Sequence, residues 1–182
     1  MKVPLSWLRE YVAVDMPAGE LAERLALTGT EVERVSRVGV PAEGGNLDRF
    51  VIGQVKKKAA HPNADKLLLC EVDVGNGRVE QIVCGARNFE EGDKTAVCLP
   101  GGVLPGGRRL ESAVIRGIES HGMMCSEAEL GISSESAGIM VLPGDAPVGK
   151  KLADYLPIHD EVLELEVTPN RPDCLSVYGV AR

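Results

Sequence analysis

Residues 67–84 read LLLCEVDVGNGRVEQIVC, and this stretch decides the fold of the chain. It contains two β-prone runs, at residues 67–74 and 81–84, that are separated by Asn76-Gly77. Asn-Gly is the dipeptide that best fits a two-residue hairpin turn, because both positions need a positive φ. The stretch therefore predicts two antiparallel strands joined by a tight turn.

Further β-prone runs lie on either side of this hairpin, at residues 50–55, 95–99 and 112–118. About five strands within about a hundred residues, with a short helix near residues 126–130, fit a five-stranded barrel of the OB type. A β-sandwich has the same strand spacing, so the pattern alone leaves both architectures open. The 21 glycines and 11 prolines are dispersed and favour a β-rich body over a helical bundle.

The two ends of the chain have different patterns from this middle part. Residues 20–27 repeat leucine four residues apart and stop at Thr28-Gly29, which predicts a helix, and a strand is expected at residues 31–35. Residues 160–167 alternate strictly and predict a strand, and residues 174–182 begin a helical pattern that does not finish. Because neither end alone has enough apolar surface for a core, we expect both to pack together.

The expected fold class is therefore α+β and β-rich, with a five-stranded OB-type barrel inserted into a small split α/β domain. Residues 1–40 are expected to form the first half of the split domain and residues 41–149 the barrel domain. Residues 150–182 are expected to form the second half of the split domain, truncated at its C-terminal end.

The net charge of −7 looks unsuitable for a nucleic-acid-binding protein, but the charge is unevenly distributed. Residues 49–118 carry 11 basic and eight acidic side chains, whereas residues 119–182 carry four basic and 11 acidic ones. Screening limits the reach of distant charges to about 8–10 Å, so a local basic face can still hold phosphates. The composition is compatible with RNA binding and does not require it.

Cellular location and metal chemistry are constrained by what the sequence lacks. It has no apolar run of signal-peptide or membrane-span length, and its five cysteines form no CxxC pair. We expect a cytoplasmic protein with free thiols, and neither a zinc site nor a disulfide.

Four segments carry a more specific signal than the composition does. They are AHPNADKL at residues 60–67, IVCGARN at 82–88, LPGGVLPGG at 99–107 and RGIESHGMMCSEAELG at 116–131. In this order they resemble the tRNA-binding domain of bacterial-type phenylalanyl-tRNA synthetase β subunits, of some methionyl-tRNA synthetases and of small tRNA-binding cofactor proteins. The flanks VPLSWL at residues 3–8 and EVTPNRPDCLS at 166–176 resemble the β subunit in particular. One small departure is Gly102, where relatives often have alanine.

The resemblance implies an accessory, tRNA-binding part of phenylalanine–tRNA ligase, an α2β2 aminoacyl-tRNA synthetase that uses ATP and Mg²⁺ in translation. In that family the aminoacylation site lies in the α subunit and the editing site further along β. The resemblance therefore implies no catalytic residue, cofactor or metal in this chain. It implies as partners tRNA, the α subunit and the remainder of the β subunit, and no membrane or DNA.

The residues expected to contact tRNA are cationic or polar and lie in the middle of the chain. OB barrels bind nucleic acid on one open face and its loops, so these side chains are expected to meet on one backbone track. The set is Lys56, Lys57, Lys58, His61, Asn63, Lys66, Arg87, Asn88, Arg108, Arg109 and Arg116. Phe50 and Phe89 are the only aromatic residues between 41 and 150, which favours recognition of phosphates and shape over stacking on bases.

Several alternatives stay open. A lysine run at a strand end is also typical of a solvated edge that discourages aggregation. The chain as a whole fits a structural module that joins subunits, or a free-standing tRNA-binding cofactor. Catalysis is disfavoured because His61 and His121 have no Cys or Ser partner at motif spacing. Asp173 is expected to cap the helix that follows it.

Overall fold

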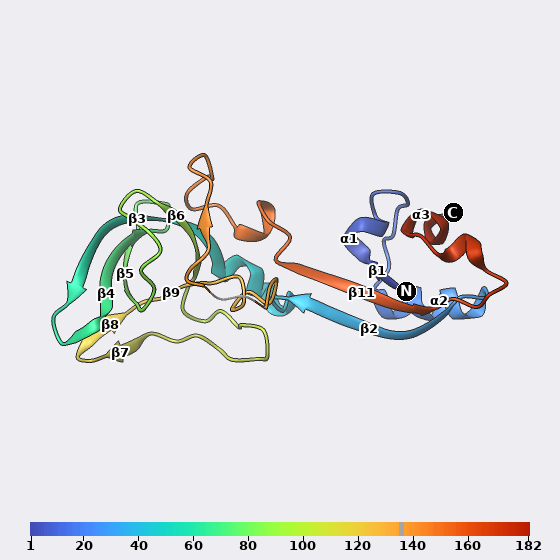
Figure 1. The fold of residues 1–182 in the computed structure, drawn as a ribbon, viewed down its shortest axis with the longest axis horizontal. Coiled ribbons are helices and arrows are strands. Elements are labelled where there is room, and N and C mark those ends of the chain that lie inside the picture. Colours follow the sequence, from blue (N-terminus) through green and yellow to red (C-terminus); the bar gives the residue numbers. More distant parts are fainter. Residues whose placement is uncertain (135–136) are drawn as a thin grey trace. The chain divides into compact units, whose positions relative to one another are not determined.

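The computed structural model describes residues 1–134 and 137–182, which form two compact units (Figure 1). The terminal unit combines Met1–Val38 with His159–Arg182, and the central unit is Gly39–Ile158. Domain limits at residues 40 and 149, which the sequence indicates, stay predictions.

The terminal unit contains a three-stranded sheet in the order β1-β11-β2. Its strands are β1 (Lys2–Pro4), β2 (Glu31–Gly39) and β11 (His159–Glu166), and its helices are α1 (Leu5–Leu8), α2 (Ala18–Leu27) and α3 (Val177–Ala181). The central strand β11 buries Leu163 and Leu165 and leaves Glu166 exposed. The helix at residues 20–27 and the strand at 160–167 are thus confirmed, because the apolar face of each meets a common core with Val3 and Leu5.

Asp173 does not cap the last helix, contrary to the sequence-based expectation. Ser176 caps α3, since its Oγ accepts a hydrogen bond from the Gly179 N–H at 3.0 Å. Asp173 instead accepts from the Arg171 guanidinium, at 3.1 Å from Nε and 3.0 Å from Nη2. The hydrogen bond from Arg171 holds the pKa of the Asp173 carboxyl below its usual value.

The central unit is built on an antiparallel sheet in the order β10-β6-β3-β4-β5, with β9 also paired to β6. The strands are β3 (Phe50–His61), β4 (Ala64–Asp73), β5 (Val79–Cys84), β6 (Lys94–Cys98), β9 (Met123–Met124) and β10 (Val141–Leu142). Strands β4 and β5 form the predicted hairpin, with φ of 54° at Asn76 and 73° at Gly77. Short 3-10 helices lie at Glu43–Arg49 and Leu152–Asp154.

Strand β3 is buried on both faces, which explains its uninterrupted apolar start. Phe50 and Ile52 pack into one core with Cys98, whereas Val51 and Val55 pack into the core on the other face. Successive side chains of a strand point to opposite faces, so this alternation places two separate cores on either side of one strand. This double burial agrees with the position of β3 in the middle of the sheet.

A closed barrel of the OB type is not confirmed. Among residues 1–134 and 137–182, no strand ladder joins β5 to the other end of the sheet. Two hydrogen bonds instead tie β5 to residues 120–121, from the His121 N–H to the Gln81 carbonyl (2.8 Å) and from the Val83 N–H to Ser120 Oγ (3.1 Å). The sheet is therefore curved and partly connected rather than a continuous cylinder of paired strands.

Two local expectations are wrong. Residues 112–118 form part of a hairpin rather than one strand, with β7 (Ala113–Ile115) and β8 (Ile118–Ser120) on either side of Arg116-Gly117. The positive φ values of 50° and 85° at these two residues reverse the chain. The helix expected near residues 126–130 is a single turn, in which the Leu130 N–H donates to the Ser126 carbonyl at 3.1 Å.

The five cysteines are free and buried, as the sequence indicates. Burial raises the pKa of the Cys70 and Cys98 thiols to about 12. Because the thiolate is the reactive form, these two side chains act as small apolar residues of the cores.

Candidate nucleic-acid interface

Four exposed side chains of the expected set gather where loops of the central unit meet. Asn63 lies in the β3–β4 turn, Lys66 on β4, Arg87 after β5 and Arg116 in the β7–β8 turn. The Asn63 Nδ2 donates to the Arg116 carbonyl at 3.0 Å, and the Arg87 Nη2 donates to the carbonyl of Asp65, next to Lys66, at 2.8 Å. In Figure 1 the β3–β4 and β7–β8 hairpins end on the same side of the central unit. We call these four residues the tip cluster.

The cations of the tip cluster have no carboxylate partner among the residues that the structure describes. The side chains of Lys66 and Arg116 make no hydrogen bond or ion pair there, and the guanidinium of Arg87 donates only to a main-chain carbonyl. Cations without an internal partner keep their hydrogen-bond donors available for phosphate oxygens. The loops therefore present a small cationic surface assembled from three separate parts of the sequence.

The three lysines of β3 differ from the tip cluster because each of them faces a carboxylate. The ion pairs are Lys56–Asp73 at 3.5 Å, Lys57–Glu71 at 3.5 Å and Lys58–Glu90 at 2.8 Å. Exposed ion pairs contribute little stability, so Lys56 and Lys57 can exchange their partners for a phosphate. The amine of Lys58 also donates to the Phe89 carbonyl at 2.6 Å, so this lysine holds the loop after β5.

Arg108 and Arg109 lie on the loop that follows Pro105-Gly106-Gly107, outside the β3–β4 and β7–β8 hairpins, and Arg109 forms a bridge with Val103. Arg109 pairs with Glu111 at 3.1 Å, whereas Arg108 is exposed. No hydrogen bond or ion pair joins either arginine to the tip cluster within residues 1–134 and 137–182.

His61 is buried, with 4% of its surface exposed, and both of its ring nitrogens have partners inside the unit. Nδ1 accepts from the Asn63 N–H at 3.1 Å, and Nε2 lies 3.2 Å from the Ile115 carbonyl. The imidazole therefore joins the β3–β4 hairpin, which carries Asn63 and Lys66, to the β7–β8 hairpin, which carries Arg116, and it does not itself face solvent.

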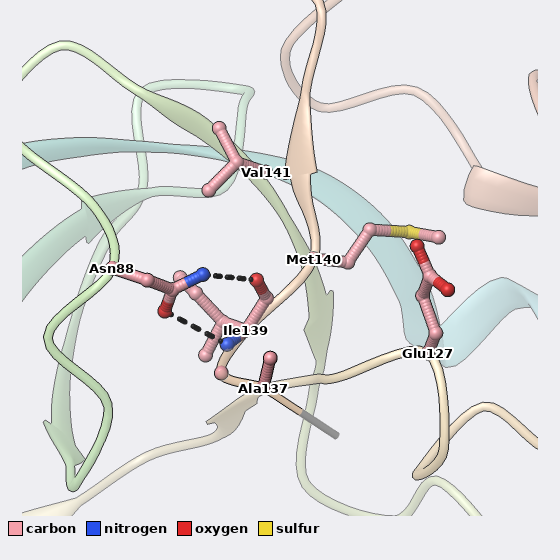
Figure 2. Close-up of a pocket in the computed structure, with 7 residues that line it drawn as sticks. Asn88, Glu127, Ala137, Ile139, Met140 and Val141 are labelled. Carbon is pink, nitrogen blue, oxygen red and sulfur yellow. Dashed lines mark hydrogen bonds between the residues drawn. The ribbon is translucent and has the colours of Figure 1, made fainter. Parts of the chain in front are cut away.

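Asn88 also uses its side chain inside the unit, beside a cavity of about 210 Å³ (Figure 2). Its Nδ2 donates to the Ile139 carbonyl at 2.8 Å, and its Oδ1 accepts from the Ile139 N–H at 3.0 Å. Asn88 thus pairs with residue 139 as a neighbouring strand would, and both polar atoms of its amide are engaged. The cavity is also lined by Glu127, Ala137, Gly138, Met140 and Val141.

The model of the family described as "Putative tRNA binding domain" matches residues 50–151. The chain belongs to this family. The matched range contains every residue expected to contact tRNA, including the whole tip cluster. The family membership inferred from the four sequence segments is confirmed.

The curated relatives that the chain resembles are longer proteins. The phenylalanine–tRNA ligase β subunit of Geobacter sulfurreducens is 51% identical over 183 residues, and that of Fusobacterium nucleatum is 46% identical over 182. Each match covers 100% of this chain and 22% of the relative, so the chain spans about a fifth of the length of these relatives. A solved structure, the MetRS related protein from Pyrococcus horikoshii, is 26% identical with a TM-score of 0.41, covering 55% of this chain and 84% of that one.

No group of three His, Cys, Asp or Glu side chains in the described part of the chain is placed to hold a metal ion. None of its helices is long and apolar enough to cross a membrane. A second cavity of about 350 Å³ is lined mainly by small and apolar residues, among them Cys84, Met123 and Met124.

The sequence does not reveal the main-chain anchors of the tip cluster. The carbonyls of Asp65, Ile115 and Arg116 hold Arg87, His61 and Asn63 respectively. Main-chain acceptors leave no signal in residue identity. The only indication in the sequence was that all three lie within the AHPNADKL and RGIESHGMMCSEAELG segments or next to them.

Replacing Asn88 with alanine is expected to lower the free energy of unfolding by about 1–2 kcal/mol, because both hydrogen bonds to the main chain of Ile139 are lost. Hydrogen exchange of the Ile139 amide, followed by NMR, should be accelerated in the variant. Asn88→Asp keeps the acceptor for the Ile139 N–H, so the exchange of this amide should be accelerated less than in Asn88→Ala. An unchanged exchange rate of the Ile139 amide in Asn88→Ala would show that the Asn88 side chain does not hold this residue.

Proposed function

We propose that the central unit binds the sugar-phosphate backbone of tRNA through the tip cluster, as an accessory part of a phenylalanine–tRNA ligase β subunit. The observation that carries the proposal is the convergence of Lys66, Arg87 and Arg116. These cations come from strand β4, the segment after β5 and the β7–β8 turn. They lack carboxylate partners among the described residues and lie within the range matched by the tRNA-binding family.

The chemistry of this surface favours phosphate over base recognition. Phe50 and Phe89 are buried, with 0% and 2% of their surfaces exposed, so residues 50–151 present no aromatic ring for stacking. Sequence-specific recognition of RNA usually splays bases out onto such rings. Phosphates remain as the partner of the exposed cations. In this proposal Lys56, Lys57, Arg108 and Arg109 are additional contacts outside the tip cluster.

For the complete protein we propose the properties that the β-subunit relatives suggest. The polypeptide works with an α subunit in a cytoplasmic α2β2 ligase that uses ATP and Mg²⁺ to charge tRNA, and this chain contributes binding and architecture without catalytic residues. The central unit corresponds to an OB-type barrel domain at residues 41–149, inserted into a split domain of residues 1–40 and 150–182. Its curved sheet and the β5 contacts to residues 120–121 support that reading.

The proposal is tested by titrating the complete polypeptide with a phenylalanine-accepting tRNA transcript over a range of salt concentrations. Log K should fall linearly with log salt, and each lost phosphate contact should reduce the slope by about 0.7–0.9. Arg87→Gln should weaken binding about three- to tenfold and reduce the slope accordingly.

Arg78 provides the matched control, because it is equally an exposed arginine beside β5, at the opposite end of that strand, paired with Glu80. Arg78→Gln should change the affinity less than about twofold. Equal effects of the two substitutions, or the absence of saturable binding, would instead favour a module that only joins subunits.

A further inference from the structure

The hydrogen bonds of His61 determine which of its nitrogens carries the proton. A main-chain carbonyl only accepts, so Nε2 must donate to Ile115 O, and a main-chain N–H only donates, so Nδ1 must accept from Asn63. The ring is therefore held as the Nε2–H tautomer with no free hydrogen-bonding atom. Its 4% exposure leaves no route for a direct contact with RNA.

Arginine is an unusual residue at the position that Arg116 occupies in the β7–β8 turn. Arg116 has φ of 50°, a left-handed conformation that Asn, Asp or Gly adopts more readily in a two-residue hairpin turn. Strained backbone of this kind persists where the surroundings hold it in place. Here an exposed guanidinium occupies a position at which the turn alone would favour a different residue.

Two side chains of the β3–β4 hairpin hold this turn through consecutive carbonyls. His61 binds the Ile115 carbonyl, and the amide of Asn63 binds the Arg116 carbonyl at 3.0 Å. His61 also accepts from the main chain of Asn63 and so fixes the residue that makes the second bond. Both attachments of the Arg116 turn thus depend on one imidazole ring.

We propose that His61 is a positioning residue for tRNA binding, which sets the guanidinium of Arg116 on the cationic surface without touching the RNA. The inference rests on the proposed function, since it assumes that Arg116 contacts a phosphate. It assigns to His61 a role different from the direct contact that the sequence indicates.

A double-substitution cycle between His61 and Arg116 tests the proposal in the complete polypeptide, with a phenylalanine-accepting tRNA transcript as the probe. His61→Asn keeps an acceptor for the Asn63 N–H, and His61→Gln keeps a donor for the Ile115 carbonyl. His61→Asn loses the bond to the Ile115 carbonyl, and His61→Gln loses the acceptor that fixes Asn63, which holds the Arg116 carbonyl. Each should therefore weaken binding about three- to tenfold. In the Arg116→Gln background the same changes should alter affinity less than about twofold.

His121→Gln is the matched control. His121 directly follows β8, at the end of the β7–β8 hairpin away from the Arg116 turn, and its ring interacts with Ser112 and Glu119. This substitution should leave the affinity within about twofold of the parent protein. The tautomer provides a second readout, since ¹⁵N NMR of the His61 ring should show the proton on Nε2. Should the His61 variants fail to fold, Asn63→Ala breaks the other attachment and should give the same dependence on Arg116.

Each other outcome overturns the positioning role. His61 substitutions with equal effects in both backgrounds would mean that the ring acts independently of Arg116, and substitutions without effect, or an Nδ1–H tautomer, would remove its role. If Arg87→Gln weakens binding but Arg116→Gln does not, the positioning role fails while the proposed function stands. If neither weakens binding, both fail.

Discussion

Replacing Gly75 with alanine is expected to destabilise the central unit by about 3–5 kcal/mol, the largest effect of any single substitution that we predict. Gly75 has φ of 86°, and a Cβ on it would overlap the Cα of Gly149. The approach is equally close from the other side, where a Cβ on Gly149 would lie 2.6 Å from the Cα of Gly75. Main-chain atoms cannot rotate away as a side chain can, so one of the two segments must move.

The segment that would move is part of the sheet. The Gly149 N–H donates to the Ile52 carbonyl at 2.8 Å, and the Ile52 N–H donates to the Lys150 carbonyl at 3.0 Å. Shifting residues 149–150 therefore weakens hydrogen bonds at the buried start of β3. Urea unfolding followed by circular dichroism should show a lower midpoint with an unchanged m-value.

Gly77 separates the steric effect from the backbone effect. It lies in the same turn with φ of 73°, but beyond its chain neighbours no heavy atom of the described residues lies within 4 Å of a Cβ placed on it. Gly77→Ala should therefore cost only the left-handed conformation, about 1–2 kcal/mol. If Gly75→Ala costs no more than Gly77→Ala, the contact between the two glycines does not constrain the fold.

The β4–β5 hairpin shows which part of the structure a sequence can predict. Its turn depends on local conformational preferences, and Asn76-Gly77 adopts the expected positive φ values. The β7–β8 hairpin has the same kind of turn, but the sequence predicts one strand there, because arginine at position 116 is not a typical turn residue. Arginine is a poor residue for a left-handed position, and only the Gly117 that follows it signalled a reversal.

The lysine run shows why charge along the chain is a weak guide to a binding surface. The carboxylates that face Lys56 and Lys57 come from β4, and the strand pairing shifts by one residue between Val55 and Lys57. Such a β-bulge changes which side chains are opposite each other, and it cannot be predicted from the residue types in this strand. The sequence alone therefore does not predict which carboxylates pair with Lys56 and Lys57.

The tip cluster depends on contacts between segments far apart in the chain, which a pattern analysis cannot supply. Asn63 and Arg116 are 53 residues apart, and Asn88 and Ile139 are 51 apart. The resemblance to a tRNA-binding family, which the family model over residues 50–151 confirms, did not distinguish cations without a carboxylate partner from His61 and Asn88, whose side chains bind the main chain. That distinction follows from hydrogen bonds and burial alone.

Removing all three cations of the tip cluster, as Lys66→Gln, Arg87→Gln and Arg116→Gln together, is expected to lower tRNA affinity about a hundredfold. The slope of log K against log salt should become shallower by about 2–3, because the three lost phosphate contacts no longer release counterions. Folding should be almost unaffected, because the side chains of Lys66 and Arg116 have no partner among the described residues. Fluorescence anisotropy of a labelled phenylalanine-accepting tRNA transcript, measured at several salt concentrations, would give both quantities.

A second triple variant distinguishes a local contact from the effect of net charge. Lys2, Arg24 and Arg34 are exposed cations of the terminal unit, with 73%, 63% and 66% of their side-chain surfaces accessible. Changing these three to glutamine alters the net charge by the same amount. Because the Debye length is about 8 Å at physiological salt, charges outside the binding surface should have little influence, and the affinity should fall less than about threefold. If both triple variants lose the same affinity, tRNA responds to the overall charge of the protein rather than to the three cations of the tip cluster.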